Sequence, residues 1–184
     1  AAKEEKRKNL ANVRSGEYEG LKEKISKKEW KPDFGLAFNK KSGATAIGVR
    51  DFLIAYNINL NTKSTRLANA IAFDVREKGR IKRKGHPVIG DIVYDKNSNP
   101  EKIPGSLKHV KAIGWYIDEF GIAQISMNLT NITETPIHTV FDEVSKKAEI
   151  RGARVTGSEL VGLIPLKSIL DAGKYFLKKQ NRSI

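Results

Sequence analysis

The residues from Ile122 to Thr130 alternate between apolar and polar side chains, and this alternation constrains the fold more than any other feature of the sequence. The apolar row contains Ala123, Ile125, Met127 and Leu129, and the polar row contains Gln124, Ser126, Asn128 and Thr130. Because successive side chains of a strand point to opposite faces, the pattern predicts a strand with one face on a core and the other face open.

The order of the predicted elements around this strand indicates the fold class. The elements are, in chain order, a strand over Arg50–Leu60, a helix capped by Thr62 or Ser64 and ending at Lys78, strands over Val110–Asp118 and Ile122–Thr130, a helix from Pro136 to Gly152, a strand over Arg154–Ile164 and a helix after Pro165. The first six form a βαββαβ pattern. We therefore predict an α/β chain of the α+β kind, with a ferredoxin-like βαββαβ layer, an extra C-terminal helix and a helical N-terminal remnant.

Three local expectations follow from the spacing of apolar and turn-forming residues. In the first strand, Phe52 should share the core face with Ile54. In the last helix, the inward side chains should be Leu166, Ile169, Leu170 and Leu177. The proline- and glycine-rich segment from Arg80 to Lys108 should be a long loop that includes a small hairpin.

Composition excludes several kinds of function. The 184-residue chain has no cysteine, which excludes disulfides, thiolate metal sites and cysteine nucleophiles, and which fits a cytoplasmic protein. No apolar run approaches the roughly 20 residues that span a bilayer, so no membrane association is expected. The net charge of +13 favours an anionic partner such as a nucleic acid or a polyanionic small molecule, although it also serves solubility.

The three histidines, His86, His109 and His138, are not spaced as metal ligands, and none lies near a serine or acid in a recognised catalytic arrangement. We therefore predict no metal site and no catalytic residue in this chain. RNA binding by a basic ferredoxin-like domain requires aromatic side chains on the middle strands, and the strand Ile122–Thr130 has none. Nucleic acid is therefore disfavoured as a partner.

The polar sides of the predicted strands are candidates for a binding cleft. Asn57, Asn59, Gln124 and Asn128 carry short amides, which are less typical of a solvated face than lysine and glutamate. Amides that are covered need hydrogen-bond partners. These four residues are therefore expected to line a cleft, with contact to a second subdomain and a simple wet face as the alternatives.

The loop that precedes the first strand is a second candidate. Its sequence, GLAFNKKSG, comprises Gly35, Leu36, Ala37, Phe38, Asn39, Lys40, Lys41, Ser42 and Gly43. Glycines allow a backbone to approach a ligand closely, and the two lysines are suited to carboxylates. The loop has neither P-loop nor dinucleotide-binding spacing, so an ordinary connector remains the alternative.

Six ordered segments carry a resemblance to a known family: RSGEYEGL, WKPDFG, GATAIGVRDFLIAYNINLN, AIGWYIDEFGIAQISMNLTN, HTVFDEV and GSELVGLIPLKSILDAGKYFL. Together they cover nearly the whole chain except Arg80–Lys108, and they resemble the formiminotransferases. The resemblance implies transfer of a formimino group from N-formimino-L-glutamate to N5 of tetrahydrofolate in histidine degradation. Folate polyglutamate would then be the co-substrate, and the protein would be a homodimer.

The resemblance also implies a domain organisation and assigns the loop. Residues 1–42 would be the tail of the N-terminal subdomain, and residues 43–184 the C-terminal subdomain. The segment from Gly35 to Gly43 matches the folate-binding loop of the family, with one residue fewer near Leu36.

The family's general acid–base histidine lies in a Lys-Gly-Glu-His-Pro motif of the N-terminal subdomain. Here the KGHP sequence at Lys84–Pro87 lacks the glutamate and lies in the other subdomain, so His86 does not inherit that role. We expect the 184 residues alone to be inactive. A non-catalytic folate- or anion-binding module, a basic RNA-binding domain and a dimerisation unit remain alternatives, and the sequence does not separate a formimino from a formyl donor.

Overall fold

The structure, a computed structural model, describes residues 7, 9–35, 38–86 and 89–183. The chain divides into two compact units, Ala1–Arg50 and Asp51–Ile184. Within the described residues, no helix is both long and apolar enough to cross a membrane.

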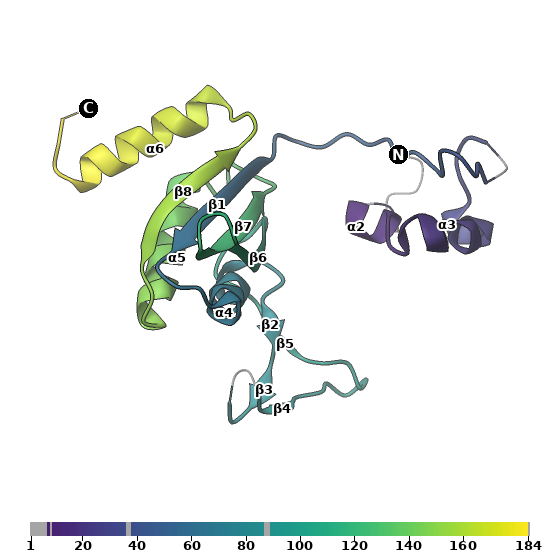
Figure 1. The fold of residues 1–184 in the computed structure, drawn as a ribbon, viewed down its shortest axis with the longest axis horizontal. Coiled ribbons are helices and arrows are strands. Elements are labelled where there is room, and N and C mark those ends of the chain that lie inside the picture. The colour runs from purple at the N-terminus through teal and green to yellow at the C-terminus, as the bar shows by residue number, and fades with distance from the viewer. Residues whose placement is uncertain (1–6, 8, 36–37, 87–88, 184) are drawn as a thin grey trace. The chain divides into compact units, whose positions relative to one another are not determined.

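The unit Asp51–Ile184 contains the predicted βαββαβ layer (Figure 1). Its elements are β1 (Ile54–Leu60), α4 (Thr65–Val75), β6 (Val110–Ile117), β7 (Ile122–Leu129), α5 (Ile137–Ile150) and β8 (Val155–Val161), followed by α6 (Leu166–Lys179). The strands form one antiparallel sheet in the order β6-β7-β1-β8. This is the ferredoxin-like order, so the predicted fold class and the extra C-terminal helix are confirmed.

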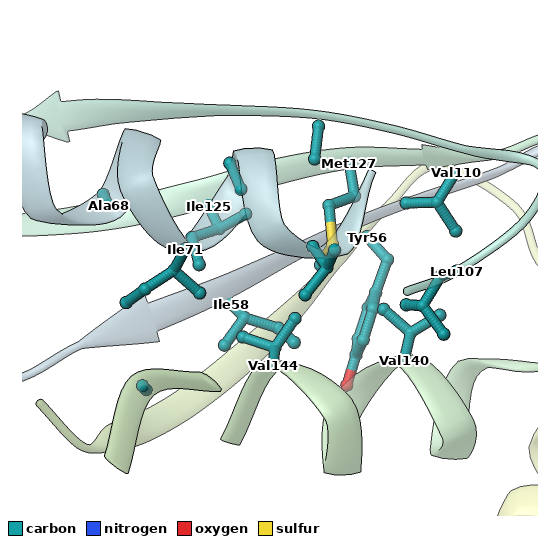
Figure 2. Packing of buried hydrophobic residues seen from close by; sticks show 14 of the residues in the cluster. Tyr56, Ile58, Ala68, Ile71, Leu107, Val110, Ile125, Met127, Val140 and Val144 are labelled. Carbon is teal, nitrogen blue, oxygen red and sulfur yellow. The ribbon is translucent and has the colours of Figure 1, made fainter. Parts of the chain in front are cut away.

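The two helices of the layer cover the same face of the sheet. Helix α4 packs against β6 and β7, and α5 packs against β1 and β8. Alternate side chains of the strands point into this core, where they meet the apolar faces of the helices (Figure 2). The fully buried members include Ile54, Ile58, Leu60, Ile71, Val75, Ile125, Leu129, Val140 and Val144. The apolar row of β7 therefore lies where its alternation predicts.

Ser64 caps the N-terminus of helix α4, and its hydroxyl accepts a hydrogen bond from the backbone N–H of Leu67. One turn later, the side chain of Asn69 joins α4 to β6 by two hydrogen bonds. Its amide donates to the carbonyl of Gly114 and accepts from the N–H of Gly114, each at 3.0 Å. A Cβ at Gly114 would lie only 2.2 Å from the backbone nitrogen of Asn69, so glycine lets the helix approach the strand.

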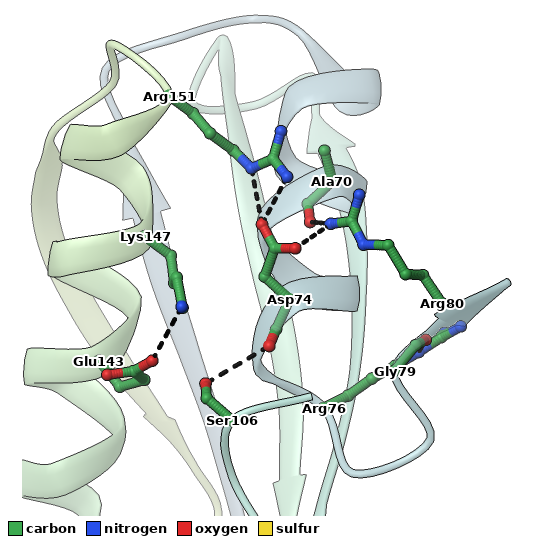
Figure 3. Close-up of polar contacts among 9 residues, drawn as sticks. All are labelled: Ala70, Asp74, Arg76, Gly79, Arg80, Ser106, Glu143, Lys147 and Arg151. Atoms are coloured by element: carbon green, nitrogen blue, oxygen red, sulfur yellow. Dashed lines mark hydrogen bonds and ion pairs between the residues drawn. The ribbon is translucent and has the colours of Figure 1, made fainter. Parts of the chain in front are cut away.

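The segment after α4 is a narrow arm rather than a long unstructured loop. It is built from short antiparallel pairs, β2 (Arg80–Ile81) with β5 (Lys102–Ile103) and β3 (Arg83–Lys84) with β4 (Asp91–Ile92). At the base of the arm, Asp74 of α4 pairs with Arg80 and with Arg151 at the end of α5 (Figure 3). The small hairpin expected within residues 88–100 corresponds to the bridge between Tyr94 and Pro100, and the Arg80–Asp74 ion pair ties the base of the arm to α4.

Two expectations about apolar positions are wrong. Strand β1 begins at Ile54, because its partner on β7, Leu129, is the last residue of that strand. Phe52 consequently lies outside the sheet with 75% of its surface exposed. In α6, the residues expected to face inward are exposed: Leu166, Ile169, Leu170 and Leu177.

Helix α6 instead contacts α5 through a different face. Ala172 is buried, the rings of Phe176 and Phe141 meet edge to face at 5.8 Å, and Tyr175 stacks on His138 at 4.5 Å. Apolar spacing predicted that α6 has an apolar stripe, but the part of the chain that the structure describes does not cover that stripe.

The unit Ala1–Arg50 contains the helical remnant expected at the N-terminus. Its described elements are α2 (Leu10–Val13), α3 (Glu17–Ser26) and a 3₁₀ turn (Lys28–Trp30). The ammonium group of Lys24 lies over the ring of Trp30, 4.2 Å from its centre, which holds the 3₁₀ turn against α3.

Candidate functional site

The face of the sheet opposite the helices carries a row of polar side chains that crosses all four strands. Gln124 lies at its centre on β7. Its Oε1 accepts a hydrogen bond from Trp115 Nε1 on β6 at 2.9 Å, and its Nε2 donates to Asn59 Oδ1 on β1 at 2.6 Å and to Glu159 Oε2 on β8 at 2.9 Å. The register explains this grouping, because Gln124 lies directly opposite both Trp115 and Asn59.

Gln124 has no exposed surface, although it lies on the open side of the sheet. The side chains of its three partners enclose its amide, and the three hydrogen bonds satisfy one acceptor site and both donors. Gln124 is therefore held in one orientation, and it holds Asn59 and Glu159 in turn.

Asn57 lies beside this row, between Ser126 on β7 and Glu159 on β8. Only 7% of its surface is exposed, and its side chain makes no hydrogen bond to the described residues. The structure thus brings together Asn57, Asn59 and Gln124, three of the four amides expected to line a cleft. The fourth, Asn128, lies on the same face but is exposed and outside the hydrogen-bonded row.

Sequence reasoning missed Glu159 and Trp115 as members of the row. Alternation places Trp115 on the open face of β6, but only the register shows that it meets Gln124. Glu159 joins the row because Asn57 lies opposite it across the β1–β8 pair. A sequence contains no direct signal for that pairing.

Exposed apolar side chains of β6 border this face. Trp115 is 44% exposed and its neighbour Ile113 is 55% exposed, and both stand at the β6 side of the polar row. The open face therefore combines an aromatic and aliphatic border with a floor of amides and one carboxylate, which suits a flat, polar ligand.

The loop expected to bind folate belongs to the other unit, Ala1–Arg50. Asn39 Oδ1 accepts hydrogen bonds from the backbone N–H of Lys41 at 2.8 Å and of Ser42 at 3.1 Å, and Asn39 O accepts from Gly43 N at 2.8 Å. Gly43 has a φ of 65°, which favours glycine. The second half of the loop is thus a closed turn.

This turn is attached to α3 by Tyr18. The Tyr18 hydroxyl donates to the carbonyl of Lys40 at 2.5 Å, and its ring lies 5.6 Å from that of Phe38. The side chains of Lys40 and Lys41 are exposed, and neither ammonium group forms an ion pair with the described residues. They are therefore accessible to an anion. Gly35 begins the loop with a φ of 75°, and Leu36 and Ala37 lie outside the described residues.

The three histidines lie away from the polar row. His86 is in the arm, where its Nδ1 accepts from Ile89 N, and His109 Nε2 is 2.8 Å from Glu134 Oε2. His138 is on α5, at the contact with α6, and burial lowers its pKa against the opposing effects of Asp171 and Asp142. Among the described residues, no three histidine, aspartate or glutamate side chains gather to hold a metal ion.

Two family profiles match the chain. The formiminotransferase domain matches residues 55–184, and the N-terminal subdomain of the formiminotransferase domain matches residues 1–50. These ranges correspond closely to the two structural units.

Curated relatives agree with these profiles. A formimidoyltransferase-cyclodeaminase from Dictyostelium discoideum is 49% identical over 95% of this chain and 29% of its own length. The protein of the same name from Gallus gallus is 45% identical over 98% of this chain and 30% of its own length. A glutamate formimidoyltransferase from Thermoplasma acidophilum is 37% identical over 97% of this chain and 51% of its own length. The chain thus spans 29% to 51% of the length of these relatives, and it belongs to the formiminotransferase domain family.

Proposed function

We propose that these residues are part of a glutamate formiminotransferase, which transfers a formimino group from N-formimino-L-glutamate to N5 of tetrahydrofolate in histidine degradation. The proposal rests on the membership of the chain in the formiminotransferase domain family. The hydrogen-bonded polar face of its sheet is consistent with that membership. In this proposal, residues 1–42 are the tail of the N-terminal subdomain and residues 43–184 are the C-terminal subdomain. The working protein would be a cytoplasmic homodimer.

Each candidate region, taken by itself, is suited to a chemical feature of a folate. The amides and the carboxylate of the open face are suited to the pterin ring, which carries several hydrogen-bond donors and acceptors. Lys40 and Lys41 are suited to the carboxylates of the glutamyl tail, and charge-assisted hydrogen bonds of this kind are among the stronger ones. The net charge of +13 would also raise the local concentration of an anionic folate polyglutamate.

The transfer requires N5 to attack the amidine carbon and a proton to reach the departing glutamate nitrogen. A histidine that titrates near neutrality suits that proton transfer, but His86, His109 and His138 all lie off the polar row. In this proposal, the chain contributes binding and orientation of the folate. The imidazole would come from the family's Lys-Gly-Glu-His-Pro motif.

The test is a transfer assay on the full-length protein with N-formimino-L-glutamate and tetrahydrofolate, in which mass spectrometry follows the formimino-folate product. We expect product with the full-length protein and none with residues 1–184 alone. Tight folate binding without turnover would favour a non-catalytic binding module. Salt-sensitive RNA binding without folate binding would favour a nucleic-acid protein.

A further inference from the structure

A cavity of about 230 Å³ lies at the base of the arm, where residues of α4, α5 and the strand pair β2–β5 come together. Its apolar walls include Phe73 of α4 and Ile103 of β5. Its polar lining consists of four side chains, Asp74, Arg80, Ser106 and Lys147 (Figure 3). Because α4 and α5 contribute to it, the cavity lies on the helix side of the sheet.

The wall between α4 and the arm is built without a ligand. The backbone N–H of Ser106 donates to the carbonyl of Asp74 at 2.9 Å. A Cβ at Gly105 would lie only 2.0 Å from the carbonyl oxygen of Arg76, so glycine allows the turn to pack directly on the end of α4. The cavity is therefore preformed, as is usual for sites that bind small molecules.

The charged side chains around this cavity do not balance. Both oxygens of the Asp74 carboxylate are used, Oδ1 by Arg80 and Oδ2 by Arg151, whose Nε lies at 2.7 Å. Lys147 Nζ is 3.5 Å from Glu143 Oε1. Three cations thus face two carboxylates, and the group carries one positive charge in excess. An anion would neutralise that excess.

Arg80 has the hydrogen-bond donors that such an anion needs. Only 13% of its side chain is exposed. Its Nη2 donates to the carbonyl of Ala70 at 2.7 Å and to the carboxylate of Asp74, whereas its Nε and Nη1 make no hydrogen bond to the described residues. Buried N–H groups without partners are costly. A guanidinium offers its donors as a planar fork that matches the oxygens of a carboxylate or a phosphate.

The size and the walls of the cavity define the rest of the ligand. Sites for drug-sized ligands measure roughly 300–1,000 Å³, so a cavity of about 230 Å³ suits a smaller molecule. The side chains of Phe73 and Ile103 would contact a short apolar group. The hydroxyl of Ser106 makes only a long hydrogen bond, of 3.4 Å, and is a further donor for the anionic group.

We propose that this cavity binds a small organic anion, in which one carboxylate or phosphate group is attached to a short apolar group. Arg80 and Lys147 pair with the anionic group, and Phe73 and Ile103 contact the apolar part. Such a ligand would join α4, α5 and the arm, and it would therefore stabilise the folded protein. The inference goes beyond the proposed function and does not depend on it, because no residue of the polar row or of the loop Gly35–Gly43 takes part.

The test measures binding to the full-length protein by calorimetry, with butyrate and propyl phosphate as the two anionic probes. Butyramide is the neutral probe, since it has the shape of butyrate without the charge. We expect at least one anion to bind and to raise Tm, and butyramide to do neither. The anion with the lower Kd identifies the group that the site prefers. Equal binding of butyramide, or binding of neither anion, would overturn the site.

Two substitutions with matched controls locate the binding. Ile103→Glu places a carboxylate beside Arg80 and should raise the Kd of the anion at least about 10-fold. Ile81→Glu makes the same change in charge on the opposite face of the same strand pair and should leave Kd unchanged. Lys147→Gln should raise Kd about 2- to 5-fold. Lys146→Gln, at the exposed neighbouring position of α5, should not change it.

Melting curves should show which variants are folded, and Lys147→Gln tests the site without any change in the arm. Equal effects of Ile103→Glu and Ile81→Glu, together with equal effects of Lys147→Gln and Lys146→Gln, would indicate a general influence of charge and would overturn the site. A protein that transfers the formimino group but binds neither anion would overturn this inference alone. A protein that binds the anion without any turnover would contradict only the proposed function.

Discussion

Gln124 Nε2 and Glu159 Oε2 are joined by a hydrogen bond of 2.9 Å, although their strands β7 and β8 are separated by β1. The bond passes over β1 beside Asn59, which also accepts from Gln124. One buried side chain thus connects three strands and, through Trp115, the fourth. The open face of the sheet is therefore a preorganised polar surface rather than a set of independent solvated residues.

Removal of the central amide should destabilise the fold. Gln124→Leu leaves Trp115 Nε1, Asn59 Oδ1 and Glu159 Oε2 without their partner, and we expect a loss of about 1–3 kcal/mol in the free energy of unfolding. Urea denaturation measures this change. Asn128→Leu is the control on the same strand and face, and because Asn128 is exposed and outside the row it should change stability by less than about 0.5 kcal/mol. Equal effects of the two substitutions would contradict the network.

The approach of α4 to β6 should not tolerate a methyl group at residue 114. A Cβ there would lie 2.2 Å from Asn69 N and 2.7 Å from Ala68 Cβ, so Gly114→Ala must separate the helix from the strand. We expect a loss of about 3 kcal/mol or more, measured by thermal unfolding. Gly173→Ala in α6 meets nothing within 4 Å and should stabilise the protein by about 0.5–1 kcal/mol. A neutral Gly114→Ala variant would contradict the described packing.

His138 should make stability depend on pH. Burial lowers the pKa of His138, so the folded protein resists protonation where the unfolded chain accepts a proton. Stability is then unaffected above the ordinary pKa of about 6.5 and falls as the pH decreases below it. His138→Phe preserves a ring against Tyr175 and should flatten that part of the Tm profile between pH 7.5 and 5. His86→Gln, in the arm, should retain it, and a profile unchanged by His138→Phe would exclude this origin.

The lysine pair of the loop should discriminate between folates by tail length. In the full-length protein, Lys40→Gln with Lys41→Gln should raise the Kd of a folate polyglutamate by about 2- to 30-fold, as expected for two exposed ion pairs. The effect on the monoglutamate should be smaller, and the difference should shrink at high salt. A control with Lys22→Gln and Lys31→Gln carries the same change in charge elsewhere in the same unit. An equal effect of the two double substitutions would indicate only a general influence of charge.

The sequence predicted those parts of the fold that depend on local patterns. Alternation identified β7 and its buried row, and the helical spacing of Val140, Val144 and Ala148 identified the core face of α5. The predictions that were wrong concern residues whose burial depends on contacts with other elements of the fold. The apolar stripe of α6 does not reveal which residues cover it, and Phe52 continues a strand pattern beyond the end of its partner strand.

In the candidate site too, some residues could be predicted from local sequence patterns and others could not. The amides of β1 and β7 are recognisable because they occupy positions where a strand usually carries charged or apolar residues. Glu159 was not recognisable, because its place beside Asn57 depends on the register between β1 and β8. Register is set by the buried faces of the paired strands, which a single strand pattern does not specify.

A crystal structure of the full-length protein with bound tetrahydrofolate tests the central claim most directly. The account predicts the pterin ring on the open face of the sheet, beside Trp115 and within hydrogen-bond distance of the amides or the carboxylate of that face. A pterin ring bound elsewhere, with Glu159 and Asn57 facing only solvent or another subdomain, would contradict it.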